Sequence, residues 1–540
     1  MERRWKALSW AFLFAVFGLL CAFMEMRIDC LLDSDVSAEL ILAELLHREG
    51  KWVMTDRWFY PSEIRVFSFQ LIMGPLFGLF EDWHTVRVAG SVICYLLLLG
   101  SFFYFCCQTG LKEQFPLAAA FLLLPFCYEY FAVVLYGLFY LPHMILQFLV
   151  IGMVLQCRRC ESRAGCVLLS AGVGGLSFLG GLGGQRLPVI LSAPLVFAAC
   201  FVAFFDWLDG ERKGRPLLSL GAGGSGRAVL LSVYGAVCCF LGLLINQLVF
   251  AKQFQFRSYQ FVRLRLPSLS QLKDVMIGWL RSLGLWSGRS VWVGDWPTSG
   301  ALSTDDAWLR LAVSLLLAAV IAGILLYSVI RRRTLSYEAR FVQAFLLGGG
   351  LVMTCLYTVT TMEFTVRYLL PVTVFSIPAA ALFFKEAVFP KKRLFLACLL
   401  LLAAGSAARN YERFWDVDVT AEYRKIAKAA VDAGYTAGYA SFWNGDVLTE
   451  LSDGKLEMWV WNWESNQNGA ERIDDIFVWL QKADHAEAEP TGPCFVLLGP
   501  DEREGSPILD KMDPGRIFYD SGGYVLYGYG SVKELEGELE

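Results

Sequence analysis

Residues 8–35 read LSWAFLFAVFGLLCAFMEMRIDCLLDSD, and this stretch decides how the chain is built. The run from Trp10 to Met24 contains no charged residue. An α-helix needs about 20 mostly apolar residues to cross the roughly 30 Å hydrocarbon core of a bilayer, so residues 8–26 are long enough for one span. The residues after it include the closely spaced acids Asp33 and Asp35.

The residues before this segment are basic, as they are before a secretory signal peptide. Arg3, Arg4 and Lys6 precede the apolar run, but no small-residue cleavage site follows it. We therefore expect an uncleaved signal anchor with its amino end in the cytoplasm.

The same apolar pattern recurs along the chain. Hydrophobic residues make up 56% of the 540 residues and charged residues 18%, whereas soluble domains are about one quarter charged. The fold class predicted is mainly α, a polytopic transmembrane bundle of about 11 spans with external juxtamembrane helices and a small C-terminal α/β domain. The expected spans are 8–26, 87–107, 115–134, 142–156, 164–182, 188–206, 228–250, 307–330, 341–360, 368–386 and 393–408.

Basic turns orient these spans, because Lys and Arg near span ends remain in the cytoplasm. One arrangement places all the strongly basic turns and the N-terminus inside. Residues 27–86 and 251–306 then become two external loops of a membrane domain, 1–409. Residues 410–540 form an extracytoplasmic domain of a multi-pass cell-membrane protein. The basic turns are Arg158-Arg159, Arg212 to Arg215, Arg331 to Arg333 and Lys391 to Arg393.

Two apolar segments do not fit a simple span. Residues 64–80 would reverse the orientation of everything after them, so we expect them to lie on the outer surface or re-enter. Residues 115–141 are interrupted by Pro125 and Glu129, so they could form one span followed by an external helix.

The first external loop carries candidate catalytic residues. Asp35 and Glu39 share a helix face because they are four residues apart, and Asp33 could cap that helix. A carboxylate here could act as a general base toward a hydroxyl or amine, or it could hold a divalent cation. The plain alternative is a set of solvated loop acids. Aromatic and charged residues follow in the same loop, Tyr60, Glu63 and Arg65.

The second external loop combines basic and aromatic residues. Arg257, Arg263 and Arg265 are interleaved with Phe254, Phe256 and Tyr259. Such a loop suits an anionic lipid headgroup, since a guanidinium can hold a phosphate through two hydrogen bonds. General contact with anionic lipids is the alternative. An external loop between spans does not suit nucleic acid.

Further candidates sit at the predicted outer ends of spans. Arg186 and Arg367 are functional candidates because ionisable residues near a membrane are costly, although both could simply extend to the interface. The four histidines are scattered, so no metal site is expected from them.

The order of these features resembles the C-type membrane glycosyltransferases, which include protein O-mannosyltransferases and aminoarabinose transferases. The resemblance rests on Asp33-Ser-Asp35 after the first span, on Glu49-Gly-Lys-Trp52, on Arg367-Tyr368-Leu-Leu-Pro371, and on the tail segment Tyr439 to Ser452. It covers most of the chain in architecture and only these patches in sequence. The family's usual Asp-Glu pair reads Asp35-Val36 here, which leaves the roles of Asp33 and Asp35 exchangeable.

The resemblance implies a mechanism. A polyprenyl-phosphate sugar would place its phosphate at the external arginines, and Asp35 would take a proton from a glycan, lipid or protein acceptor. The acceptor would attack the anomeric carbon with inversion. Positive charge stabilises a leaving phosphate, and no nucleotide is needed outside the cell; the lipid-linked sugar is the co-substrate, and a divalent cation is a possible cofactor.

The tail is acidic, with 26 acidic and 11 basic residues from Asn410 onward. Helices are predicted at 419–433 and 471–483, and the last residues, 533–540, are expected to be frayed. We expect strands at 435–442, 456–463, 494–499 and 523–529. The tryptophans Trp443, Trp459, Trp461 and Trp463 could stack on sugars, but a core role is favoured.

Two other functions stay open. A transporter or lipid flippase is the first, although internal repeats and charges near the middle of the bilayer, which are typical of transporters, are not evident. A membrane scaffold whose tail binds a partner is the second.

Overall fold

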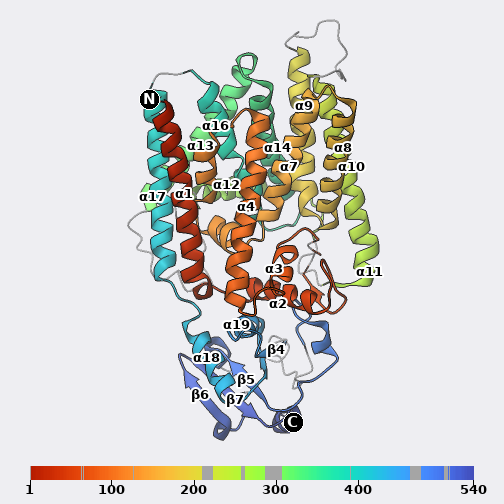
Figure 1. The fold of residues 1–540 in the computed structure, drawn as a ribbon, viewed down its shortest axis with the longest axis vertical. Coiled ribbons are helices and arrows are strands. Elements are labelled where there is room, and N and C mark those ends of the chain that lie inside the picture. Colours follow the sequence, from red (N-terminus) through yellow and green to blue (C-terminus); the bar gives the residue numbers. More distant parts are fainter. Residues whose placement is uncertain are drawn as a thin grey trace.

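A computed structural model describes residues 2–61, 64, 66–125, 127–208, 223–256, 262–285, 307–388, 391–461, 476–503, 509 and 511–539. A bundle of long helices stands on a small domain with a mixed sheet, as Figure 1 shows. The fold is therefore mainly helical, with a helical body and a small C-terminal α/β domain, as the sequence predicts.

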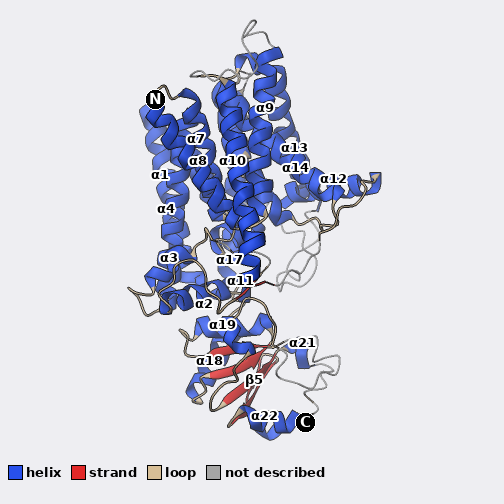
Figure 2. Ribbon diagram, turned by 90° about the vertical axis from the view of Figure 1, so that its right-hand side faces the viewer, coloured by secondary structure: helices blue, strands red, loops and turns tan. Residues whose placement is uncertain are grey.

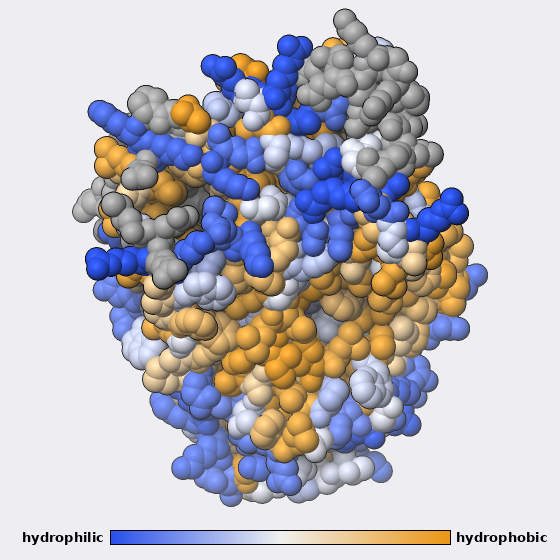
Figure 3. Space-filling view, turned by 45° about the horizontal axis from the view of Figure 1, so that its top comes forward, coloured by the Kyte–Doolittle hydropathy of each residue, from blue (hydrophilic) through white to orange (hydrophobic). Residues whose placement is uncertain are grey.

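The long helices are those of a multi-pass membrane protein. In the described part of the chain, nine helical stretches are long and apolar enough to cross a membrane. A broad apolar band lies between polar ends in Figure 3. The helices that carry these stretches, with α15 and α16 sharing one, are α1 (Glu2–Arg27), α4 (Trp83–Thr109), α7 (Leu141–Arg159), α8 (Arg163–Leu182), α9 (Ala193–Leu208), α10 (Ser225–Ile245), α14 (Tyr337–Val359), α15 (Leu370–Thr373), α16 (Ser376–Glu386) and α17 (Lys392–Asp416).

A tenth predicted span, 307–330, is also a single helix, α13 (Ala307–Ile330). Helix α17 continues past the predicted domain boundary at 409/410 and ends at Asp416. The chain enters the C-terminal domain only after this point.

The predicted span 115–134 is wrong as a continuous helix. Helix α5 (Phe115–Leu123) has 9 residues, a length of about 13 Å, which is under half of the bilayer core. It ends because Leu124 precedes Pro125 and takes an extended conformation. A short helix α6 (Tyr128–Tyr130) and the π-helix η2 (Phe131–Tyr136) follow. Asn410 of α17 donates a hydrogen bond to the Pro125 carbonyl oxygen at the break.

The first external segment folds against the end of the bundle. Helix α2 (Ser34–Arg48) follows the short 3-10 helix η1 (Ile28–Cys30), and α3 (Gln70–Leu76) packs against α2 and α4. With only 7 residues, α3 cannot cross a bilayer. The prediction that 64–80 forms no span is confirmed for the described residues.

The two external segments are joined by backbone pairing. Strand β1 (Phe59–Tyr60) runs parallel to β2 (Gln255–Phe256), which follows the π-helix η4 (Asn246–Phe250) and the short α-helix α11 (Ala251–Gln253). On its other side, Phe59 exchanges hydrogen bonds with Gln481 and Leu480 of the C-terminal domain. Helix α12 (Leu269–Leu285) lies across the bundle against α13 and α14 (Figure 2). Residues 57–60 thus connect both external loops and the tail.

The opposite end of the bundle collects the basic turns. Lys6 pairs with Glu113 at 2.7 Å, Arg158 with Glu338 at 2.8 Å, and Lys385 donates to the Gly110 carbonyl at 2.8 Å. We call this the basic end and the end that carries the C-terminal domain the domain end. The N-terminus lies at the basic end (Figure 1), together with the described basic turns, whereas the predicted turn from Arg212 to Arg215 lies outside the described residues.

The C-terminal domain is a three-layer unit. Its sheet has the order β4-β3-β5-β7-β6, parallel for the first three strands and antiparallel for the rest. Helices α18 (Ala421–Asp432) and α19 (Phe442–Leu451) cover one face, and α22 (Val532–Leu539) covers the other. The strands are β3 (Ala437–Ala440), β4 (Glu457–Val460), β5 (Cys494–Leu498), β6 (Ile517–Ser521) and β7 (Tyr524–Tyr529).

Two predictions for the tail are wrong. Residues 476–482 are not helical, because their backbone bridges to extended neighbours: Ile476 to Trp461 and Lys482 to Trp58; residues 471–475 lie outside the described residues. The expected frayed end is instead α22, which buries Leu535 and Leu539 against the sheet. Its apolar residues are spaced for one helix face among acidic ones.

Because α22 packs in the core, Leu535→Ala should destabilise the C-terminal domain by about 2–5 kcal/mol. The Leu535 side chain is 0% exposed, so truncation leaves a cavity. Thermal unfolding of the purified protein, followed by tryptophan fluorescence, measures the loss. Lys533→Ala, an exposed position on the same helix, is the control. Equal melting of the two variants would contradict the packing of α22.

Candidate functional site

Two acidic residues stand at the start of α2, at the domain end of the bundle. Asp33 caps the helix, and its carboxylate accepts a hydrogen bond from the Val36 amide at 2.8 Å. Asp35 lies in the first turn, and Glu39, one turn later, is buried. The predicted cap and the shared helix face are both observed. Acids at a helix N-terminus are stabilised by the helix dipole.

The C-terminal domain covers these acids. Helix α19 packs on α2, and a buried ion pair joins the two domains. Arg87 of α4 binds both carboxylate oxygens of Glu450, with Nη2 to Oε2 at 2.7 Å, and also donates to the Val36 carbonyl at 3.1 Å. Both side chains are 3% exposed. Arg87 therefore ties a membrane helix to α19 and to the backbone beside Asp35.

Asp446 stands one helical turn before Glu450 on α19, so it faces the same side. It is 3% exposed, and its Oδ2 atom is buried without a hydrogen-bond partner. Burial, and then the charge of Asp35, hold the pKa of the Asp446 carboxyl well above its usual range, while Lys482 opposes them. The protonation of an acid in the tail is thus affected by the charge of an acid in the first loop.

The surroundings of Asp33 also favour a proton. Burial, and then the charge of Asp35, raise the pKa of Asp33 to about 7, against the lowering effects of the Val36 amide and Arg87. Two carboxyl groups that share a poorly solvated site do not both ionise easily. Burial and the charge of Asp35 therefore favour a proton on both Asp33 and Asp446.

A second group gathers the predicted arginines at the same end of the bundle. Arg186 lies over the rings of Tyr140 and Tyr368, at 5.2 Å and 5.6 Å from their centroids. Arg367 lies 5.6 Å from the centroid of Tyr368. These contacts are within cation–π range. Two arginines predicted from different spans thus meet at one aromatic ring.

Arg265 of the second loop is predicted from the sequence to contact a lipid headgroup, but its side chain also bonds to the protein backbone. Its Nη2 donates to the Tyr357 carbonyl at 2.8 Å, at the end of α14, so part of its hydrogen-bonding capacity caps a helix. The backbone of Arg263 pairs with Thr361, and the Arg263 side chain is exposed. Three other predicted residues, Glu63, Arg65 and Arg257, lie outside the described residues.

Tyr60 occupies a structural position. Its hydroxyl donates to the Thr55 carbonyl at 3.1 Å and accepts from the Thr55 amide at 2.9 Å. Its ring packs against Phe254 and Phe256 of the second loop. The side chain is 3% exposed, and burial raises its pKa above the usual range. It holds the two loops together.

The first loop also approaches the end of α8. The carbonyl oxygen of Ile64 lies 3.9 Å from where a Cβ atom on Gly183 would be. Gly183 precedes Arg186 by three residues, so the first loop comes near the segment that leads to the arginine group.

Other candidate chemistry is sparse. No three His, Cys, Asp or Glu side chains of the described residues are placed to hold a metal ion. Of the tail tryptophans, Trp459 and Trp461 are buried, as expected for a core, whereas Trp443 is 61% exposed. Trp463 lies outside the described residues.

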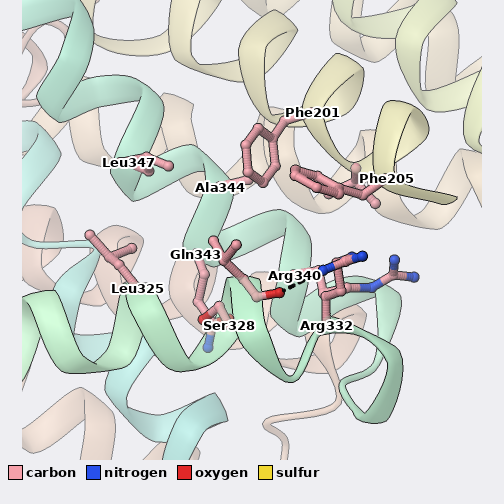
Figure 4. Close-up of a pocket in the computed structure, with 11 residues that line it drawn as sticks. Phe201, Phe205, Leu325, Ser328, Arg332, Arg340, Gln343, Ala344 and Leu347 are labelled. Carbon is pink, nitrogen blue, oxygen red and sulfur yellow. Dashed lines mark hydrogen bonds between the residues drawn. The ribbon is translucent and has the colours of Figure 1, made fainter. Parts of the chain in front are cut away.

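A cavity lies at the basic end, far along the helices from the acids. It is lined by Phe201 and Phe205 of α9, by Leu325 and Ser328 of α13, and by α14 (Figure 4). Arg332 at its rim donates to the Val329 carbonyl at 3.1 Å. None of the predicted site residues lines it.

Sequence reasoning missed three residues of the acid group, Arg87, Asp446 and Glu450. Two signals could have indicated them. Arg87 is a charge at the edge of an apolar span, and Asp446 and Glu450 repeat the four-residue spacing of Asp35 and Glu39. What joins them is contact between segments more than 350 residues apart.

The raised pKa of Asp33 predicts a pH-dependent stability. The folded protein holds this proton more tightly than the unfolded chain, so stability is lost as pH rises from about 4 to about 7. Asp33→Asn keeps a capping side chain and removes the charge. Its melting temperature should exceed that of the wild type above pH 7 and match it near pH 4. A difference that does not change with pH would contradict this assignment.

The Arg87–Glu450 pair predicts a large effect from breaking one partner. Arg87→Met leaves a buried carboxylate unpaired and should cost about 3–5 kcal/mol, measured by thermal unfolding in detergent. Lys425→Met, which breaks the exposed pair with Glu422, should cost under about 1 kcal/mol. A double variant, Arg87→Met with Glu450→Leu, should recover stability. If Arg87→Met lost no more stability than the control Lys425→Met, the Arg87–Glu450 pair would not be what joins the domains.

No family model matches the chain, and no curated protein does. Among solved structures, the chain is similar to the Archaeoglobus fulgidus oligosaccharyltransferase, crystallised with a tethered acceptor peptide that contains the NVT sequon. The two share 12% sequence identity, with a TM-score of 0.47 over 96% of this chain and 74% of that chain. With so few shared residues, the similarity assigns no role to any side chain.

Proposed function

We propose that the chain is a membrane glycosyltransferase that moves a sugar from a polyprenyl-phosphate carrier to an acceptor outside the cytoplasm. The observation that carries the proposal is the junction at the domain end. There the acids of the first loop lie under the C-terminal domain, and the same loop is paired to the second loop and approaches the end of α8 that precedes Arg186.

Each group has a chemical role in this proposal. Arg186 and Arg367 bind the phosphate of the carrier beside Tyr368, and the lipid tail stays in the bilayer. Asp35 removes the proton from an acceptor hydroxyl or amine. The acceptor atom then bonds to the anomeric carbon, and the bond from that carbon to the phosphate oxygen breaks. The phosphate leaves with the electron pair, and the arginines offset its charge.

The orientation belongs to the same proposal. The basic end faces the cytoplasm, as the positive-inside rule expects, so the acids, the arginines and the C-terminal domain lie outside. A lipid-linked donor fits this side because its sugar is already activated.

Asp35→Asn tests the proposal. The variant should fold and insert normally and lose about 100-fold or more in transfer, because the general base is gone. Cells that carry only this variant are compared with wild type by mass spectrometry of their glycolipids, glycans and glycoproteins. Glu44→Gln, an acid on the same helix that pairs with Arg48, is the control. Wild-type product from Asp35→Asn would overturn the role of Asp35.

The same comparison separates transfer from transport. A transporter or flippase would move a lipid-linked sugar across reconstituted vesicles without forming a glycosidic bond. Vesicles that translocate the lipid and yield no new glycosidic product would replace the proposed function.

A further inference from the structure

Helix α19 carries two buried acids on one face, and their surroundings differ. Glu450 is satisfied by Arg87, which binds both of its oxygens. Asp446 lies one turn away on the same face, and its Oδ2 atom has no partner. Burying an unpaired carboxylate is costly, whereas a neutral carboxyl group is buried at much lower cost.

The position of Asp446 relative to Asp35 follows from the Arg87 contacts. Arg87 donates to Glu450 from Nε and Nη2, and Nη2 also donates to the Val36 carbonyl. Val36 is the next residue after Asp35, and Asp446 precedes Glu450 by one turn. The Arg87 contacts therefore hold α2 at the residue next to Asp35 and hold α19 one turn away from Asp446.

One nearby charge favours the protonated form of Asp446 and one opposes it. The charge of Asp35 on α2 raises the pKa of Asp446, and Lys482, which lies in the segment that pairs with the first loop and binds Glu457, lowers it. On α19 itself, the charge of Glu450 is offset by Arg87. Helix α18 presents Tyr423, whose hydroxyl donates to Asn444. No cation is bonded to Asp446 among the described residues, so burial and Asp35 favour its protonated form.

We infer that Asp446 is a positioning residue for Asp35: a neutral carboxyl group, supplied by the C-terminal domain, that completes the base site. This inference rests on the proposed function. The tail is then part of the active site, because it delivers the group that sets the state and orientation of the base. Two neighbouring carboxyl groups divide the roles, one holding a proton and the other accepting one. Asp446 acts through Asp35 and need not touch the acceptor.

A purely structural role makes a different prediction. If Asp446 only filled space, an apolar residue would serve as well, and the pH dependence of transfer would not involve it. If it is a neutral donor, Asn should replace it and Leu should not, since Asn keeps an N–H donor and Leu has none.

The experiment compares Asp446→Asn, Asp446→Leu and Asp35→Asn in isolated membranes that contain the endogenous donor and acceptor, from pH 5 to pH 9. Asp446→Asn should transfer at the wild-type rate at pH 7 and lack the fall that wild type shows when Asp446 loses its proton at high pH. Asp446→Leu should lose about 100-fold, as expected for a misplaced reacting group. Glu502→Gln removes another buried acid of the same domain, bonded to Asn444, and should leave the rate and pH profile unchanged.

The outcomes distinguish the two claims. If Asp446→Leu folds and keeps the wild-type rate and pH profile while Asp35→Asn is inactive, the inference fails and the proposed function stands. If Asp446→Asn is folded but as inactive as Asp446→Leu, a neutral donor is not what the site needs, and the inference also fails. If Asp35→Asn is fully active, the proposed base itself is wrong. Thermal unfolding of each variant shows whether it is folded, and Asp446→Asn still decides the question if Asp446→Leu does not fold.

Discussion

The buried pair between Arg87 and Glu450 is the contact on which the domain end depends. Each partner is 3% exposed, and the arginine satisfies both oxygens of Glu450 and the Val36 carbonyl. Buried charges of this kind are tolerated only when every partner is present. The cost of separating them is therefore a constraint: α4, α2 and α19 must come together for any of them to be satisfied. The position of Asp35 under the tail follows from that constraint.

The first loop lies between the helical bundle, the second loop and the C-terminal domain, and it contacts all three. Its helix α2 carries the acids, its strand β1 pairs with the second loop on one side, and its backbone bonds to Gln481 and Leu480 on the other. Tyr60 closes this connection with its buried hydroxyl and its contacts to Phe254 and Phe256. Because this segment bonds to three parts of the chain, the position of the acids that it carries depends on all of them.

The fold could be predicted largely from composition and period. Apolar runs of span length and strand-like runs in the tail correspond to helices and strands, because hydrophobic burial acts locally along these segments. The failures have different causes. Leu124 and Pro125 break the 115–134 span, Ile476 and Lys482 bridge to Trp461 of the tail and Trp58 of the first loop, and α22 is helical because the sheet buries Leu535 and Leu539. In the last two cases, long-range contact overrides the local pattern.

The sequence alone predicts the membrane-spanning helices, the common end of the described basic turns, the cap at Asp33 and the placement of Asp35 and Glu39 on one helix face. These features depend on the spacing of neighbouring residues and on the cost of placing polar groups in lipid. Only the tertiary structure decided that Arg186 and Arg367 meet at Tyr368, and that Arg87, Asp446 and Glu450 complete the acid group. Electrostatic and hydrogen-bond partners act through space, so residues hundreds of positions apart in the chain become one site only after the domains have packed.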